Sequence, residues 1–283
     1  MSAGGQTPGV LRPDLAADPP PREIDPWQQV LRRPPPPRHV RTWAGLHLID
    51  LAQSLLTVVI FALFLLTFVV QPFRIPSESM ERTLLVGDFL LVDKTAYAPP
   101  GVWDWLMPYH SIHRGDIVVF HYPIDPTLHV VKRVIGLPGD RVHLQNGMVW
   151  VNDVQIQEPY VVYEPAYADD YRDDFPAQLY TDPGVNPKWW RQMRHDVRDG
   201  ELVVPDGDFF VMGDNRNYSS DSRYWGYVTQ DHIVGRPLVI YFSLRERSAT
   251  DIAEQQDDRL GQKSALDKLQ DFARWDRFLR IVR

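Results

Sequence analysis

The sequence predicts a mainly β fold, with an antiparallel-sheet domain placed between one N-terminal transmembrane helix and a C-terminal amphipathic helix. Three observations support this prediction. One apolar segment is long enough to cross a membrane, and short β-type runs recur after it with turn sequences between them. Apolar residues near the end of the chain recur at helical spacing. The 283 residues suffice for one large domain or two small ones.

The composition excludes several classes of protein. Hydrophobic residues make up 44% and charged residues 24%, which is ordinary for a globular protein. A net charge of -7 argues against a nucleic-acid partner, because such proteins usually carry a basic surface. The chain has no cysteine, which excludes disulfides, thiolate catalysis and cysteine-based zinc sites. This absence suits an oxidising exterior, but cysteine being rare in this chain explains it equally well.

Residues 1–45 are predicted to form a proline-rich tail, and residues 46–70 a transmembrane helix. Ten prolines in the first 40 residues prevent helices and central strands there. The segment Leu51–Val70 has no charge, and about 20 helical residues cross a hydrocarbon core of about 30 Å. A buried core helix is the alternative, but the segment lacks a polar face. Four arginines, at 32, 33, 38 and 41, lie just before the span and only Arg74 follows closely, which predicts a cytoplasmic tail and an external C-terminal part.

Residues 71–244 are predicted to form the antiparallel β domain. Turn sequences such as Arg-Gly-Asp at 114–116 and Pro-Gly-Asp at 138–140 separate its apolar runs, and Asn146-Gly147 predicts a hairpin. Residues 163–200, rich in Asp, Tyr, Trp and Pro, predict an irregular insertion at the domain's edge. The expected strands are Phe89–Val92, Asp116–His121, His129–Ile135, Met148–Val151, Glu201–Val204, Phe209–Met212 and Pro237–Phe242.

Residues 245–283 are predicted to form a polar linker and an amphipathic helix. Apolar residues recur there at three- and four-residue steps, with charges between them. Packing on the domain, or loss of order, is favoured over a position on the membrane surface. The apolar positions of this helix are Leu266, Leu269, Phe272, Trp275, Leu279 and Val282.

Several common catalytic and binding motifs are absent from the sequence. It contains no G-x-S-x-G, H-E-x-x-H or G-x-x-x-x-G-K-[ST] motif. His110 and His113 lack obvious further ligands, so we expect no metal site. Four other stretches stand out: IPSESMERTLLVGD at 75–88, RGDIVVF at 114–120, KRVIGLPGD at 132–140 and GDNRNYSSDSRYWG at 213–226.

These four stretches resemble, in the same order, motifs of the bacterial type I signal peptidases, and the resemblance covers roughly residues 70–242. It implies that Ser79 is the nucleophile and Lys132 the general base. It also implies that Ser77 and the backbone N–H of Ser79 form the oxyanion hole. Ser219 matches the residue that orients the lysine in this family.

The resemblance further implies supporting roles for three charged residues. Asp221 and Arg223 match an ion pair, and Asp214 matches a structural carboxylate. Two positions depart from the family's pattern. Arg82 stands where many relatives have proline, and Asn217-Tyr218 replaces a more usual Asp-Asn pair. Neither departure touches a proposed catalytic atom, so they put loop geometry in doubt rather than the reaction.

A serine–lysine pair needs a particular environment in order to react. A serine hydroxyl is a weak nucleophile until a base lies within hydrogen-bond reach. Lysine in water is protonated at pH 7, but burial among apolar groups lowers its pKa. Val130, Val131 and Val134 flank Lys132 in the sequence and are expected to help supply such surroundings.

The resemblance implies that the substrates are exported precursor proteins that carry signal peptides. Ser79 follows Val70 by nine residues, which reach about 30 Å at most, so the nucleophile stays near the outer membrane surface. The precursor is expected to bind as an added strand between Phe73–Ser77 and the strand before Lys132. The residues expected to line pockets for small side chains are Phe73, Ile75, Pro76, Met80, Leu84, Val130 and Val131.

The predicted function is therefore a membrane-bound endopeptidase that removes signal peptides after A-x-A-like sites through a serine acyl-enzyme. We expect a monomer in contact with membrane lipid, with no metal, nucleotide or other cofactor. Two alternatives remain open. One is a catalytically silent, membrane-tethered β module that binds exported chains. The other is a self-cleaving Ser/Lys regulator, a class that usually carries a DNA-binding segment.

Overall fold

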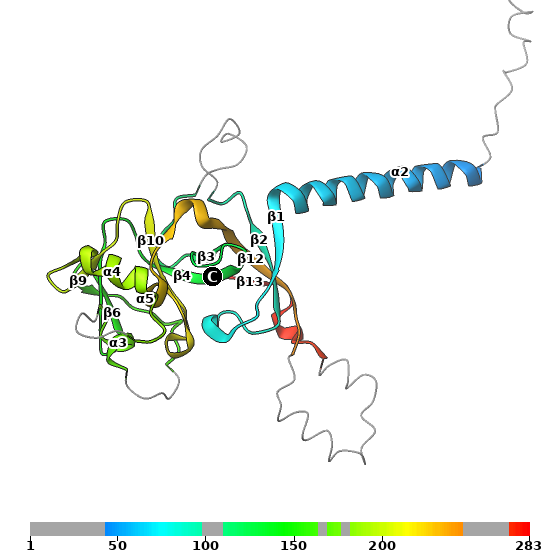
Figure 1. The fold of residues 1–283 in the computed structure, drawn as a ribbon. Coiled ribbons are helices and arrows are strands. Elements are labelled where there is room, and N and C mark those ends of the chain that lie inside the picture. The colour runs from blue at the N-terminus through cyan, green and yellow to red at the C-terminus, as the bar shows by residue number, and fades with distance from the viewer. Residues whose placement is uncertain (1–42, 98–109, 164–168, 177–181, 246–271) are drawn as a thin grey trace, which may run out of the picture. The chain divides into compact units, whose positions relative to one another are not determined.

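The structure, a computed structural model, describes residues 43–97, 110–163, 169–176, 182–245 and 272–283. The predicted proline-rich tail lies almost entirely outside these residues. The chain divides into two units, Met1–Leu56 and Thr57–Arg283. All the strands belong to the second unit, and Figure 1 colours the chain from its N-terminus, in blue, to its C-terminus, in red.

The predicted apolar helix is present as α2, Trp43–Phe64, which a π-helical turn at Leu65–Val69 extends. The stretch Leu48–Val69 has a mean hydropathy of 2.4 and is long and apolar enough to cross a membrane. Strand β1 begins at Val70, the residue predicted to end the helix. Pro72 explains this limit, because proline disfavours a helical conformation in the residue before it.

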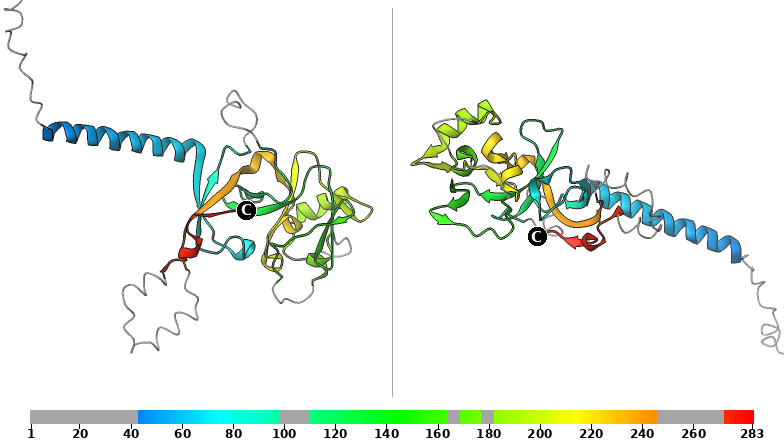
Figure 2. Two further views of the ribbon diagram at one scale, coloured as in Figure 1. Left: turned by 180° about the vertical axis from the view of Figure 1, so that it is seen from behind. Right: turned by 90° about the horizontal axis from the view of Figure 1, so that it is seen from below.

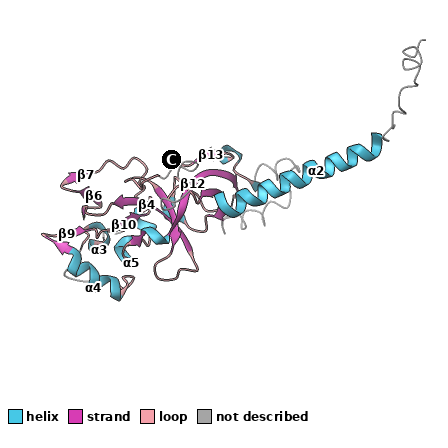
Figure 3. Cartoon of the chain, turned by 90° about the horizontal axis from the view of Figure 1, so that it is seen from above, coloured by secondary structure: helices cyan, strands magenta, loops and turns pink. Residues whose placement is uncertain are grey.

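The larger sheet has eight strands, and all of its pairs are antiparallel. Its order is β1-β2-β12-β3-β4-β10-β11, and β13 pairs with β12. The strands are β1 Val70–Arg74, β2 Asp88–Asp93, β3 Ile117–His121, β4 His129–Gly136, β10 Asp208–Met212, β11 Val228–Thr229, β12 Ile233–Ser243 and β13 Arg280–Ile281. The prediction of a mainly antiparallel β fold is confirmed, and Figure 3 shows how strands dominate after α2.

The smaller sheet has five strands in the order β7-β6-β5-β9-β8. Asn146 and Gly147, between β5 and β6, both have positive φ angles of 51° and 77°, which confirms the predicted hairpin turn. The strands are β5 Arg141–Gln145, β6 Met148–Val151, β7 Val154–Gln155, β8 Val197–Arg198 and β9 Glu201–Val203.

The predicted irregular insertion is wrong over residues 187–198, which form helix α4, Pro187–Asp196, followed by β8. The side chain of Asn186 caps α4 by accepting hydrogen bonds from two backbone amides, and proline is well suited to the first helical position. Trp189 and Met193, four residues apart, are buried against the smaller sheet. A short helix α3, Asp170–Asp173, precedes α4, and residues 164–168 and 177–181 lie outside the described part.

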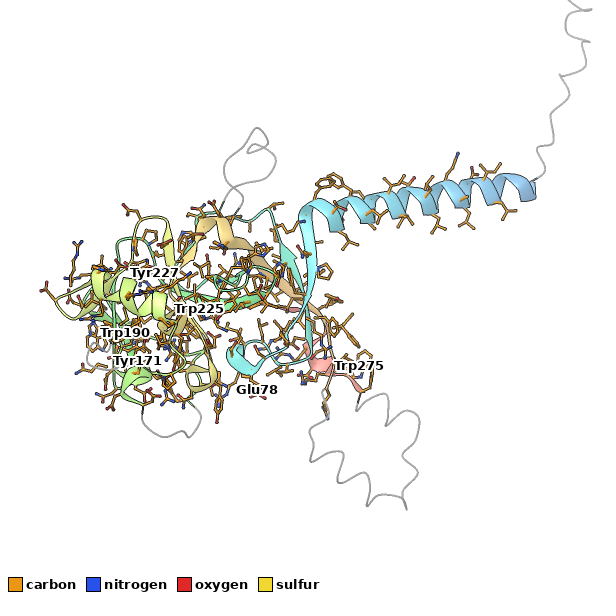
Figure 4. The ribbon with its side chains drawn as sticks, viewed as in Figure 1. Glu78, Tyr171, Trp190, Trp225, Tyr227 and Trp275 are labelled. Carbon is orange, nitrogen blue, oxygen red and sulfur yellow. The ribbon has the colours of Figure 1, made fainter. Side chains whose placement is uncertain are left out.

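Aromatic residues join α3 to α4, and α4 to the residue just before β11. The ring of Tyr171 packs near that of Trp190 at 6.3 Å, and Trp189 packs edge-on against Tyr227 at 4.9 Å. Figure 4 shows Tyr171, Trp190 and Tyr227 gathered around α4 on the side of the domain that carries the smaller sheet. The insertion therefore completes an apolar core.

The predicted C-terminal helix is wrong over the described residues 272–283. They form a 3-10 turn, η5 Trp275–Arg277, and then β13, which pairs with β12. Helical spacing predicted that Trp275 and Leu279 lie on a buried face, but both are exposed, whereas Arg277 is buried. Strand pairing and the contacts of Arg277 override the local pattern. Leu266 and Leu269 lie outside the described residues.

Four short helical turns join the strands near the site described next. They are η2 Glu78–Met80, η3 Arg216–Tyr218, α5 Ser222–Trp225 and η4 Gln230–His232.

Candidate active site

Ser79 lies in the turn η2 directly after β1, and its side chain is buried. Backbone hydrogen bonds fix both ends of this turn. Ile75 N donates to Asp88 O at 2.8 Å, and Leu84 N donates to Met80 O at 2.8 Å. Glu78, labelled in Figure 4, marks the turn on the ribbon. The strand and the following loop thus hold the Ser79 hydroxyl on a fixed backbone.

Lys132 lies in the middle of β4 and is only 3% exposed. Its partner across the sheet is Val118 on β3. Because side chains alternate along a strand, Lys132 shares a face with Val130 and Val134. Val118 and Val134 are buried in one apolar cluster, and Val130 packs against it. Nζ of Lys132 donates a hydrogen bond to Oγ of Ser79 at 2.6 Å, across 53 residues of sequence.

Burial lowers the pKa of the Lys132 amine from 10.5 to about 8. The carboxylates of Asp221 and Asp214 raise it, and the guanidinium of Arg223 lowers it further. No carboxylate makes an ion pair with this amine in the described part of the chain. Desolvation therefore dominates, and the uncharged share of the amine near neutral pH is far larger than for a lysine in water, although the charged form still prevails below pH 8.

Ser77 is exposed, and its Oγ lies 3.4 Å from Oγ of Ser79. The two hydroxyls therefore point to the same small region. Its oxyanion role stays a prediction, but this position is compatible with it.

The loop 213–223, which follows β10, packs directly on the backbone of Ser79. Asn215 N donates to Ser79 O at 3.1 Å. A Cβ atom at Gly213 would lie 2.5 Å from Ser79 O and 2.3 Å from Ser219 Oγ, so only glycine fits there. Sequence reasoning did not single out Gly213 and Asn215, although both lie within a motif that it identified.

The Ser219 side chain is 5% exposed and lies against Gly213. Its hydroxyl, like the side-chain amide of Asn215, has no hydrogen-bond partner within the described residues. The structure therefore contains no hydrogen bond between Ser219 and Lys132, and the orienting role of Ser219 stays a prediction.

Two buried ion pairs brace the site. Asp221 accepts two hydrogen bonds of 2.8 Å from the Arg223 guanidinium and one of 3.1 Å from Gly213 N. Asp214 accepts two from Arg133, at 2.8 and 2.7 Å. Burial alone would raise the pKa of Asp221, but the charge and hydrogen bonds of Arg223 hold it below its usual value.

The residues predicted to contact substrate fall into three groups. Ile75, Met80 and Leu84 are buried in one apolar cluster, against which Phe73 and Val131 pack. Val130 packs on a different cluster, and Pro76 is exposed. The structure thus brings five of the seven together beside Ser79.

This arrangement suits nucleophilic catalysis: a hydroxyl, a buried amine in contact with it and a second hydroxyl nearby. Among the described residues, no group of three or more His, Asp or Glu side chains is placed to hold a metal ion.

Comparisons with known proteins agree with this chemistry. Residues 48–242 match the family described as signal peptidase, peptidase S26. The chain is 35% identical over 216 residues to signal peptidase I of Pseudomonas fluorescens, covering 70% of this chain and 74% of that protein. It is 36% identical over 213 residues to signal peptidase I of Pseudomonas aeruginosa, covering 69% and 73%. It is 34% identical over 228 residues to signal peptidase I of Aquifex aeolicus, covering 70% and 85%. The chain therefore belongs to the signal peptidase family, peptidase S26, and is a serine endopeptidase.

Proposed function

We propose that this protein is a membrane-bound endopeptidase that removes N-terminal signal peptides from exported precursors, with Ser79 as nucleophile and Lys132 as general base. One observation carries the proposal. The two side chains, 53 residues apart in sequence, are both buried and lie 2.6 Å from each other. A base must lie this close to a hydroxyl in order to take its proton.

The reaction begins with Lys132 in its uncharged form. The Ser79 hydroxyl gives its proton to Nζ of Lys132 while Oγ attacks the carbonyl carbon of the scissile peptide bond. The resulting oxyanion accepts hydrogen bonds from the Ser77 hydroxyl and the backbone N–H of Ser79. The distance of 3.4 Å between the two serine oxygens supports this role for Ser77.

The second half of the reaction reverses the proton transfer. The Lys132 ammonium gives its proton to the leaving amine, the C–N bond breaks, and the signal peptide stays attached to Ser79 as an ester. Lys132, uncharged again, takes a proton from water while the water oxygen attacks the ester carbonyl. The Lys132 ammonium then returns this proton to Oγ of Ser79 as the ester C–O bond breaks, which releases the signal peptide with a free carboxyl group and restores the starting enzyme. Ser219 keeps the amine in position during these steps. Its burial against Gly213, next to the Ser79 backbone, supports this assignment.

The precursor binds as an extended strand beside Phe73–Ser77 and the first residues of β4, and cleavage follows small residues of the A-x-A kind. The apolar cluster of Ile75, Met80 and Leu84 supports shallow pockets, because these side chains are already packed together and leave little room. Helix α2 anchors the protein in the membrane as a monomer, with its tail cytoplasmic and the β domain outside.

The test is cleavage of a precursor with an A-x-A site by the purified full chain in detergent. Ser79→Ala and Lys132→Ala are each expected to lower kcat by about 10⁴-fold or more. Lys94→Ala is a matched control, because it removes a lysine whose amine, within the described part of the chain, bonds the carbonyl of Thr67 and neither dyad residue. Undiminished cleavage by either dyad variant, or cleavage of mature regions instead of the A-x-A site, contradicts the proposal.

A further inference from the structure

The C-terminal segment 272–283 contacts the loop that follows the nucleophile. Arg277 is 3% exposed although it lies only six residues from the end of the sequence. Its Nε donates to Oδ1 of Asp88 at 3.0 Å, and its Nη2 donates to Oδ2 of Asp88 at 2.5 Å and to Thr83 O at 3.0 Å. One guanidinium therefore holds both ends of residues 83–88, here called loop 83–88.

Loop 83–88 in turn holds the turn that carries Ser79. Leu84 N donates to Met80 O, next to the nucleophile, at 2.8 Å. Ile75, three residues before this turn, exchanges backbone hydrogen bonds with Gly87 and Asp88 at 3.0 and 2.8 Å. A displacement of loop 83–88 therefore moves the backbone on both sides of Ser79.

Two further contacts attach the C-terminal segment to this region. Arg274 donates two hydrogen bonds to Val86 O, at 3.0 and 3.1 Å. Val282 is buried in the apolar cluster that contains Ile75, Met80 and Leu84. Both views of Figure 2 show the C-terminal segment, in red, lying along β12.

We propose that Arg277 is a positioning residue for catalysis, which fixes loop 83–88 and through it the orientation of the Ser79 hydroxyl toward Lys132. This inference rests on the proposed function, because it assumes that Ser79 is the nucleophile. Arg277 makes no hydrogen bond to Ser79 or Lys132, so it acts through loop 83–88, which it binds at the Asp88 carboxylate and the Thr83 carbonyl.

The geometry requires arginine and not merely a positive charge. The planar guanidinium reaches both oxygens of Asp88 and the carbonyl of Thr83 at once, which a single ammonium group cannot reproduce. Arg277→Lys keeps the positive charge beside Asp88 but loses the planar arrangement of donors. It therefore separates compensation of the Asp88 charge from positioning of loop 83–88.

The experiment measures kcat and KM for cleavage of an A-x-A precursor by full-length Arg277→Ala and Arg277→Lys, together with thermal unfolding of each variant. A displacement of about 1 Å at a reacting group is enough for a loss of about 10²-fold. We expect this loss in kcat per folded molecule for Arg277→Ala, a smaller loss for Arg277→Lys and little change in KM. Arg280→Ala, an exposed arginine on β13, is the matched control and keeps native kcat.

Two further readouts separate positioning from a purely structural role. Added guanidinium ion is expected to restore part of the kcat of Arg277→Ala, whereas ammonium ion is not. The midpoint of the pH–activity curve is expected to stay at that of the native enzyme, because the surroundings of Lys132 do not change. A variant with lowered thermal stability but native kcat per folded molecule overturns the proposal.

If Arg277→Ala does not fold, Arg277→Lys and Asp88→Asn decide the question. Native kcat in either folded variant overturns the proposal, and reduced kcat supports it. The result for Ser79→Ala keeps the two hypotheses apart. Full activity of Ser79→Ala refutes the proposed function. An inactive Ser79→Ala together with a fully active Arg277→Ala refutes only the positioning role.

Discussion

Two buried basic side chains near the site, Lys132 and Arg223, differ in whether a carboxylate is paired with them and in the direction in which their pKa is shifted. Arg223 is 1% exposed and forms a bidentate ion pair with Asp221, and its pKa is raised above the usual value, although burial alone would lower it. Lys132 is 3% exposed, forms no ion pair among the described residues and bonds only a serine hydroxyl, and its pKa is lowered to about 8.

The difference shows how one small region serves both scaffold and chemistry. A buried charge needs a partner in contact, and the pair Asp221–Arg223 satisfies this requirement permanently. A buried amine without such a partner loses its proton more easily, as a general base requires. The carboxylates of Asp221 and Asp214 still favour the charged form of Lys132, but each is already engaged by an arginine.

The largest expected effect comes from breaking the buried ion pair between Asp221 and Arg223. Arg223→Met leaves the Asp221 carboxylate buried without its cation, which costs about 3–5 kcal/mol of unfolding free energy. Chemical denaturation of the full chain in detergent measures this loss. Because Arg223 lowers the pKa of Lys132, the pH–activity midpoint of the folded variant is also expected to rise.

The double variant Asp221→Asn with Arg223→Met is the control for that experiment. It removes both charges, so we expect it to recover part of the lost stability. Equal stability of Arg223→Met and the native chain contradicts the view that this pair is an essential brace.

A smaller effect is expected for the uncharged hydroxyl beside the dyad. Ser77→Ala removes the proposed side-chain donor to the oxyanion and is expected to lower kcat by about 10²–10³-fold, with KM and thermal stability nearly unchanged. Steady-state kinetics with an A-x-A precursor measure it. Ser111→Ala, another exposed serine, is the control. A native kcat for Ser77→Ala rules out the oxyanion role.

The smallest expected effect is the pH dependence of cleavage that the Lys132 amine produces. A pKa of about 8 means that kcat/KM rises with pH, flattens above pH 8 and falls about tenfold for each unit below it. Cleavage rates from pH 6 to 9.5 test this. His129→Gln is the control, because this imidazole lies on the same strand and its replacement leaves the midpoint near 8. A flat profile over this range shows that Lys132 is not the base, and a rate that still rises tenfold per unit up to pH 9.5 shows that the pKa of the base is not lowered to about 8.

Stability has a pH dependence of its own, with a definite sign. The pKa of Lys132 is lower in the folded chain than in the unfolded chain, so folding releases a proton from this amine between about pH 8 and 10.5. Below about pH 8 the amine is charged in both states, and the full cost of burying the charge lowers the unfolding free energy. The penalty declines as the pH rises from 8 toward 10.5. The unfolding free energy of Lys132→Met should therefore exceed that of the native chain below pH 8, and the difference should shrink above it.

Local sequence patterns predicted much of the fold. The uncharged run before Val70 predicted helix α2, the Asn146-Gly147 turn predicted the β5–β6 hairpin, and the alternating runs predicted antiparallel strands. These features depend on residues close together in the chain, because helix length, turn conformation and strand alternation are local properties. The motifs also predicted that Ser79 and Lys132 belong together.

Only the tertiary structure decided the rest. The same local spacing failed at the C-terminus, where pairing with β12 and the bonds from Arg277 to Asp88 replace the expected helix. The distance between Lys132 and Ser79, the close approach of Gly213 to the Ser79 backbone and the lowered pKa of the amine also arise from contacts across 53 residues or more. Such quantities depend on which distant groups exclude water or supply a partner, and that is fixed only when the sheets pack.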